Sequence, residues 1–185
     1  MKPAIHNHSL SYVQRLDKRR LDDIDQVVIH CTELPDMNLA RVFGEKIIHT
    51  ESQTGNCGHF YIDRDGLIEQ WVPLDRIAHH VRGFNTKSIG IELVNKGRYP
   101  HWFQSGNQHM TETYPGAQIS ALIQLLTHLE TGLPQLKTIA GHEDLDIEVL
   151  PAEDRPEIEI RRKVDPGPMF PWPDVMNKTS LKRYR

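Results

Sequence analysis

The chain has 185 residues, enough for one domain with a proper hydrophobic core. Its 22 lysines and arginines nearly balance its 25 aspartates and glutamates. The formal net charge is only −3, and no basic field marks nucleic acid as the main partner. No apolar run approaches the roughly 18 residues of a membrane-spanning helix. Two cysteines, Cys31 and Cys57, are too few for a disulfide framework, so we expect free thiols in a reducing compartment.

The first half of the chain predicts an arm, a strand, a helix and a hairpin. Residues 1–23 are polar and charged and are expected to form a solvated arm. The β-branched run over 24–31 predicts a central strand. Apolar residues at helical spacing predict a helix over 38–52, with Asn38 as its N-cap. Two short apolar runs joined by a glycine turn predict a hairpin over 59–72.

The second half adds two strands, the clearest helix and a tail. Strands are predicted over 88–94 and 136–140, and a helix over 115–132 that ends at a glycine and a proline. The basic residues 177–185 are expected to form a loose tail. Strands alternating with helices are typical of an α/β fold. We therefore predict a single domain over 24–176, with a central mixed sheet flanked by helices.

The segment around Lys163 places a cation and a carboxylate two residues apart on chain that cannot be helical. Asp165 precedes Pro166, which favours extended backbone at the aspartate. Residues i and i+2 of an extended chain point to the same side, so Lys163 and Asp165 face the same way. Taken alone, such a pair is typical of a solvated surface ion pair.

Three further polar residues fall at or within predicted strands, where α/β folds place their sites. His30 ends the first strand, Glu92 lies inside another, and His142 follows the last. A histidine at a strand end is most often a structural residue. A carboxylate between apolar neighbours needs a partner, a cleft or an exposed edge strand, because burying it unpaired costs several kcal/mol. Gly90, on the same face as Glu92, leaves room beside it.

Together these residues fit a zinc hydrolase. Catalytic zinc takes three protein ligands from histidine and carboxylate and keeps one position open for water. His30, His142 and Asp165 supply such a set from three distant segments. Glu92 would then act as general base, and Lys163 would stabilise the oxyanion on the attacked carbonyl. A chain with 11 histidines offers many other triples, so spacing alone leaves the ligand set open.

Six stretches carry a resemblance to a known family. They occur in the family's order over roughly residues 24–175 and are VVIHCT (27–32), GHFYIDRDG (58–66), AHH (78–80), NTKSIGIEL (85–93), AGH (140–142) and RKVDPGP (162–168). On these motifs the chain resembles the zinc-dependent N-acetylmuramoyl-L-alanine amidases of the type-2 family. That family is related to T7-type lysozymes and to peptidoglycan recognition proteins, so the resemblance implies an amidase-like α/β fold.

The resemblance also implies an activity and a role for each residue. It places one Zn²⁺ per chain on His30, His142 and Asp165, the catalytic glutamate on Glu92, and the carbonyl-polarising lysine on Lys163. The implied reaction is hydrolysis of the amide bond between N-acetylmuramic acid and L-alanine in peptidoglycan or in muropeptides.

Other matched positions receive lesser roles. His80 matches a family position near the groove, and we assign it as a substrate contact. His59 and His79 are assigned to structure. Gly58 stands where some family members carry tyrosine, so a tyrosine-assisted variant of the mechanism is not supported.

Two loops are long for this family. Residues 95–114 carry Tyr99, Trp102 and Phe103, which either stack on sugar rings or anchor the loop to the core. The acidic stretch 143–159 either walls the substrate cleft or forms a mobile flap.

Other readings fit the residues less well. A zincin protease needs histidine four residues after His142, but Asp146 stands there and Pro151 follows soon after. A thiol enzyme is disfavoured because His30 and Cys31 are adjacent in a strand and face opposite ways. A non-catalytic peptidoglycan-binding module is the main alternative, and the intact set of ligands, glutamate and lysine favours the enzyme.

We expect a monomer whose partner is peptidoglycan or a muropeptide, with no nucleic acid and no membrane span. The N-terminal segment lacks a hydrophobic signal stretch, which favours a cytoplasmic location and leaves phage-type or other signal-less export open. The sequence does not distinguish intact cell wall from soluble anhydro-muropeptides as the substrate.

Overall fold

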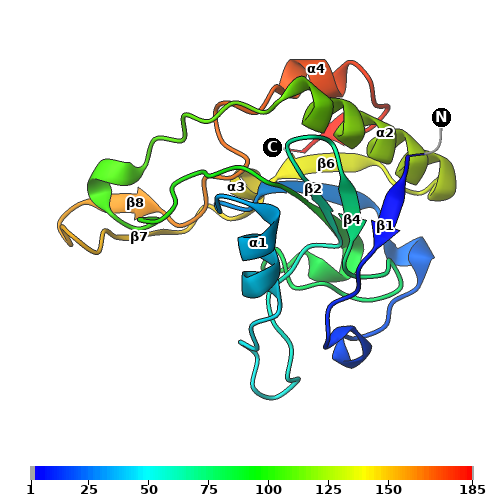
Figure 1. The fold of residues 1–185 in the computed structure, drawn as a ribbon, viewed down its shortest axis with the longest axis horizontal. Coiled ribbons are helices and arrows are strands. Elements are labelled where there is room, and N and C mark those ends of the chain that lie inside the picture. Colours follow the sequence, from blue (N-terminus) through cyan, green and yellow to red (C-terminus); the bar gives the residue numbers. More distant parts are fainter. Residues whose placement is uncertain (1–2, 185) are drawn as a thin grey trace.

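The computed structural model describes residues 3–184; residues 1, 2 and 185 of the predicted arm and tail lie outside the described part. Its main feature is a seven-stranded sheet in the order β1-β4-β3-β5-β2-β6-β9 (Figure 1). In the described part of this sheet β3 and β4 pair antiparallel and the other neighbouring strands pair parallel, so the sheet is mixed, as predicted. The strands are β1 (Ile5–Asn7), β2 (Gln26–Cys31), β3 (Phe60–Ile62), β4 (Ile68–Gln70), β5 (Ser88–Leu93), β6 (Thr138–Gly141) and β9 (Lys182–Arg183).

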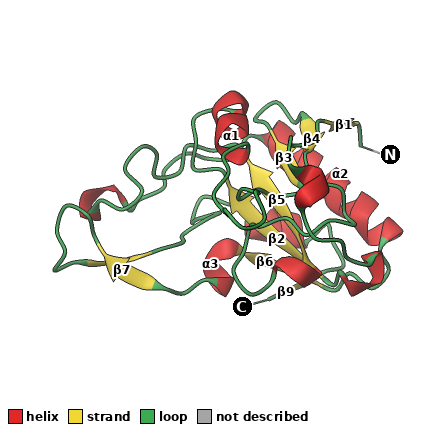
Figure 2. Cartoon of the chain, turned by 90° about the horizontal axis from the view of Figure 1, so that it is seen from below, coloured by secondary structure: helices red, strands yellow, loops and turns green. Residues whose placement is uncertain are grey.

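Helices cover the sheet and a small hairpin projects from it. The helices of at least four residues are α1 (Met37–Gly44), α2 (Gly116–Gly132), α3 (His142–Leu145) and α4 (Trp172–Met176). Side chains of α2 and α4 join the central strands in one hydrophobic cluster, whereas α1 packs in a second cluster around Trp71. Strands β7 (Val149–Pro151) and β8 (Glu159–Arg161) pair antiparallel and extend away from the sheet (Figures 1 and 2). Within residues 3–184, none of the helices is both long and apolar enough to cross a membrane.

The central strands follow the sequence predictions closely. All six residues of β2 are buried, as expected for a parallel strand covered on both faces. It pairs with β5 on one side and β6 on the other, with His30 opposite Glu92 and Ile29 opposite Gly141. This register brings the ends of three strands to one edge of the sheet, and the predicted polar residues meet there.

The predicted solvated arm and loose tail are both wrong. Leu10, Tyr12 and Leu16 of the N-terminal segment are almost fully buried, and β1 extends the sheet beside β4. At the other end β9 pairs with β6, and Leu181 is buried. These segments bury single apolar residues between polar ones, so they show no periodic pattern that marks an element.

The first helix is shorter than predicted. It ends at Gly44, and its N-cap is Asp36, whose side chain accepts a hydrogen bond from the Leu39 amide at 2.8 Å. Glycine is a poor helix former, and a Cβ at position 44 would lie 3.1 Å from the Trp71 ring. The apolar residues Ile47 and Ile48 that suggested a longer helix are 43 % and 53 % exposed.

Candidate metal centre and cleft

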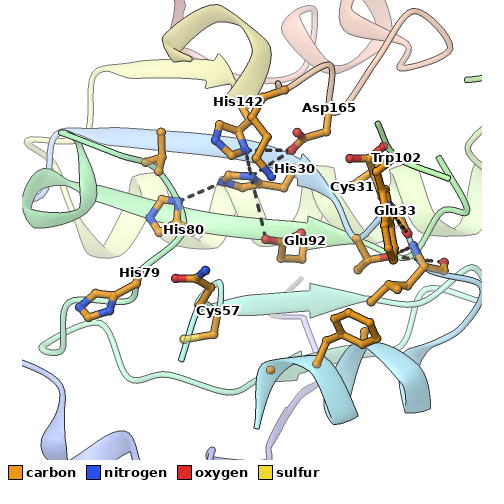
Figure 3. Close-up of a pocket in the computed structure, with 18 of the residues that line it drawn as sticks. His30, Cys31, Glu33, Cys57, His79, His80, Glu92, Trp102, His142 and Asp165 are labelled. Carbon is orange, nitrogen blue, oxygen red and sulfur yellow. Dashed lines mark hydrogen bonds and ion pairs between the residues drawn. The ribbon is translucent and has the colours of Figure 1, made fainter. Parts of the chain in front are cut away.

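Two histidines and one aspartate converge at the edge of the sheet (Figure 3). His30 Nδ1 lies 3.0 Å from His142 Nδ1 and 3.1 Å from Asp165 Oδ2, and the last two atoms are 3.2 Å apart. All three residues are at least 95 % buried. Three segments far apart in sequence thus place three potential ligand atoms around one point.

Each of these residues is positioned by a different element. His30 lies in β2, and His142 opens α3 directly after β6. Asp165 lies in a loop whose backbone is tied down: its carbonyl accepts from the Glu143 amide at 2.9 Å, and Tyr114 donates to the Pro166 carbonyl at 2.6 Å.

The three side chains fit a metal ion. Their mutual distances are close to the roughly 3.3 Å between neighbouring ligands of a tetrahedral ion with bonds of about 2.0 Å. Burial lowers the pKa of His30 to about 4, which keeps its imidazole neutral, the form that binds metal. Burial opposes ionisation of Asp165, but His142 and His30 outweigh it and hold the carboxyl pKa well below its usual range. Within residues 3–184, Asp165 Oδ1 has no hydrogen-bond partner.

Glu92 stands beside this group. Its Oε1 lies 3.9 Å from His30 Nδ1, and 15 % of its side chain is exposed. Burial raises its pKa well above the usual range, and the charge of Asp165 adds to this effect. A Cβ at Gly58 would come within 2.8 Å of Glu92 Cγ, so the glycine gives the glutamate its space.

Lys163 faces the same cleft as Asp165. Both residues belong to its lining, and the lysine charge favours the ionised forms of Asp165 and Glu92. Asp146, which stands where a zincin would need its second histidine, pairs with Arg162, and α3 has only four residues.

Four other histidines lie near the metal group or the cleft. His80 lies beside His30, with its Nδ1 3.0 Å from His30 Nε2, and it also lines the cleft. His59 is fully buried and accepts a hydrogen bond from the Gly90 amide at 3.1 Å. His79 packs edge-on against His49 at a ring distance of 4.7 Å, and both line the cleft.

A buried ion pair beside the site was not predicted. Arg98 donates to both carboxylate oxygens of Glu33, at 2.7 and 2.9 Å, and is only 2 % exposed. It also donates to the carbonyls of Arg161 and Arg162, each at 3.2 Å. The pair therefore connects the end of β2 to the residues immediately before Lys163. Its members lie 65 positions apart, and no local pattern links them.

A cleft of about 680 Å³ is lined by the loop over 95–114, through Arg98, Trp102 and Phe103, and the acidic stretch 143–159 packs against that loop. The Glu153 amide donates to the Phe103 carbonyl at 2.9 Å, and the Ser105 amide donates to Asp154 at 2.6 Å. Figures 1 and 2 show these loops running together away from the sheet. Trp102 anchors its loop by donating to the Glu33 carbonyl at 3.1 Å, and both Trp102 and Phe103 line the cleft. The acidic stretch is therefore held against the loop that lines the cleft, and its described residues are not themselves part of the lining.

Comparison with known proteins gives a consistent result. The family model for N-acetylmuramoyl-L-alanine amidase matches residues 20–168. The N-acetylmuramoyl-L-alanine amidase AmiD of Escherichia coli K12 is 35 % identical over 113 residues, covering 57 % of this chain and 35 % of AmiD. The 1,6-anhydro-N-acetylmuramyl-L-alanine amidase AmpD of Enterobacter cloacae is 32 % identical over 120 residues, covering 60 % of this chain and 50 % of AmpD. The chain thus spans about a third and a half of these two relatives.

Solved structures share the fold. LysC, an N-acetylmuramoyl-L-alanine amidase from Clostridium intestinale, superposes with a TM-score of 0.67 at 21 % identity, covering 98 % of this chain and all of that one. Drosophila PGRP-LB gives 0.67 at 16 % identity over 98 % of both chains. AmiD of E. coli in complex with anhydro-N-acetylmuramic acid-L-Ala-D-gamma-Glu-L-Lys gives 0.62 at 24 % identity, over 84 % of this chain and 57 % of that one. The family match covers most of the chain, and the chain belongs to the N-acetylmuramoyl-L-alanine amidase family.

Proposed function

We propose that this protein is a zinc-dependent amidase that hydrolyses the bond between N-acetylmuramic acid and L-alanine in peptidoglycan or muropeptides. The observation that carries the proposal is the convergence of His30, His142 and Asp165 within 3.2 Å of one another, beside Glu92 and Lys163 in one cleft. The relatives named as amidases support the reaction, and the AmiD complex supports a muropeptide as the ligand class.

Zinc held by His30, His142 and Asp165 would supply the Lewis acidity that makes water nucleophilic near neutral pH. Glu92, whose Oε1 lies 3.9 Å from His30 Nδ1, accepts the proton of the attacking water as a general base. Lys163 places its positive charge where the attacked carbonyl develops negative charge. Glu92 then returns the proton to the departing L-alanine amine.

The cleft suits a ligand that carries both acidic and apolar parts. Lys163 lines it and favours the carboxylates of a stem peptide, whereas Arg82 and Arg162, which also line it, pair with Glu148 and Asp146. Phe43, on α1, also lines the cleft, with its ring 6.2 Å from that of Trp102. All the proposed catalytic and metal-binding residues come from one chain, so we propose that a monomer is sufficient.

A non-catalytic recognition module is the competing function. Such a protein needs the groove but neither a metal nor a general base. The buried ligand set and the space that Gly58 leaves for Glu92 have no purpose in simple recognition, which favours the enzyme.

The test is mass spectrometry of the products formed by the purified zinc-loaded protein from two substrates, intact sacculi and a soluble anhydro-muropeptide. We expect release of free stem peptide beginning with L-alanine, and the faster substrate identifies wall lysis or fragment turnover as the role. Tight muropeptide binding without cleavage at full zinc occupancy would contradict the proposal and support the recognition module.

A further inference from the structure

His80 is joined to the candidate ligand His30 by a chain of hydrogen bonds that continues into the backbone. His30 Nε2 lies 3.0 Å from His80 Nδ1 (Figure 3), and His80 Nε2 lies 3.2 Å from the Ser88 hydroxyl. The Ser88 hydroxyl in turn lies 2.8 Å from the carbonyl oxygen of Phe84. His30 Nε2 and both ring nitrogens of His80 therefore have partners in this row of hydrogen bonds, and His30 Nδ1 faces the metal group.

The carbonyl of Phe84, at the far end of this row of hydrogen bonds, determines which atom donates in each bond. The Phe84 carbonyl can only accept, so the single hydroxyl proton of Ser88 is donated to it. The Ser88 oxygen must then accept from His80, which places a proton on His80 Nε2. In the neutral ring His80 Nδ1 is consequently an acceptor, and its donor is His30 Nε2–H.

This direction is the one that a metal ligand at His30 requires. A neutral imidazole carries one proton, so protonation at Nε2 leaves the Nδ1 lone pair free. That Nδ1 is the atom lying 3.0 and 3.1 Å from the other two candidate ligands. The opposite tautomer would point a proton into the metal group and prevent binding.

The surroundings hold the His80 ring in this place. A Cβ at Gly90 would lie only 2.6 Å from His80 Cγ, so the ring occupies the notch that the glycine leaves in β5. Asn85 accepts from the backbone amides of His80 and Val81 at 3.0 and 2.8 Å, which fixes the backbone that carries the ring. Both ring nitrogens are engaged within the protein, so neither is free for a substrate.

We propose that His80 is a positioning residue for the metal centre: it fixes the tautomer and ring orientation of His30 and does not bind substrate. The inference rests on the ligand set of the proposed function and replaces the substrate role that sequence resemblance gave to His80. Partners of this kind raise metal affinity by about 10- to 100-fold.

Zinc affinity, measured by competition with a chromogenic chelator, tests the role. We expect His80→Ala to weaken zinc binding by about 10- to 100-fold. His80→Gln should recover much of the affinity, because its amide accepts at one atom and donates at the other. His79→Ala is the matched control. It removes the neighbouring histidine, whose side chain takes no part in the hydrogen bonds that join His30, His80 and Ser88, and the variant should bind zinc as the wild type does.

Nitrogen-15 NMR of the zinc-loaded wild type tests the tautomer without any substitution. We expect His30 to carry its proton on Nε2 and His80 to carry its proton on Nε2.

Either of two results overturns the inference: unchanged zinc affinity in a folded His80→Ala variant, or the opposite tautomer at His30. A raised KM for muropeptide with unchanged zinc affinity would return His80 to substrate binding. A wild-type protein that binds no zinc overturns the ligand set itself, and so the proposed function and this inference together.

Discussion

The two halves of the candidate site are held by different kinds of contact. His30 and Glu92 lie opposite each other on paired parallel strands, so the backbone ladder sets their spacing. Lys163 and Asp165 lie on irregular chain that is fixed by separate polar contacts, among them Arg98 to the carbonyls before Lys163. The strand half is therefore positioned by a repeating structure, whereas the loop half depends on a few buried groups.

This difference has a physical cause. Buried backbone groups outside a ladder must find other partners, because an unpaired buried group costs as much as a lost hydrogen bond. In the loop half those partners are the Tyr114 hydroxyl, the Glu143 amide and the Arg98 guanidinium. A single substitution can thus release the loop half, but substitutions on β5 should remove chemistry without moving the frame.

The largest effect is expected from Asp165→Ala in the loop half. It removes the only carboxylate of the proposed ligand set, so we expect the purified variant to hold no stoichiometric zinc and to lack activity. Elemental analysis measures the metal directly. Asp174→Ala, at an exposed position of α4, is the matched control and should retain zinc. A full equivalent of zinc in Asp165→Ala would refute the ligand assignment.

On the strand side, Glu92→Gln should separate chemistry from metal binding. The amide keeps the shape of the side chain but cannot accept the water proton, so we expect kcat to fall by about 10²- to 10⁴-fold. Zinc content and thermal stability should stay close to those of the wild type. Turnover at the wild-type rate would remove Glu92 from the mechanism.

Arg98→Met tests the anchor of the loop half. It leaves the Glu33 carboxylate buried without its partner, so we expect the free energy of unfolding to fall by about 3–5 kcal/mol. Urea denaturation measures this change. Adding Glu33→Gln should restore part of the loss, because the buried negative charge is then gone. A stability loss under about 1 kcal/mol for Arg98→Met would show that the pair does not hold the loops.

The smallest effect is expected at the exposed ion pair between Arg82 and Glu148. Their side chains are 71 % and 48 % exposed, and such pairs contribute about 0–1 kcal/mol. Arg82→Ala should therefore leave the urea midpoint almost unchanged, and it serves as the surface counterpart of Arg98→Met. A large loss would mean that the fold depends on this exposed pair.

The same comparison explains what the sequence could predict. The buried runs of β2 and β5 and the periodic helix α2 are long and regular, so their patterns are readable. The ordered family motifs then selected two of the 11 histidines, together with Asp165, as the predicted ligands. The two- and three-residue edge strands β9 and β1 show no such pattern, because backbone pairing and a few buried side chains define them.

The contacts between distant loops were outside the reach of sequence patterns. Arg98 and Glu33 are ordinary charged residues in polar segments, and only the fold brings them together. The role of His80 is similar, because a histidine near a groove has no local mark that distinguishes a substrate contact from a partner of His30.

Anomalous X-ray diffraction at the zinc absorption edge, on crystals of the purified wild type, tests the central claim most directly. The account predicts one strong anomalous peak per chain, within about 2.0–2.2 Å of His30 Nδ1, His142 Nδ1 and a carboxylate oxygen of Asp165. A peak elsewhere, or no peak at these three residues in a crystal grown with zinc, would contradict it.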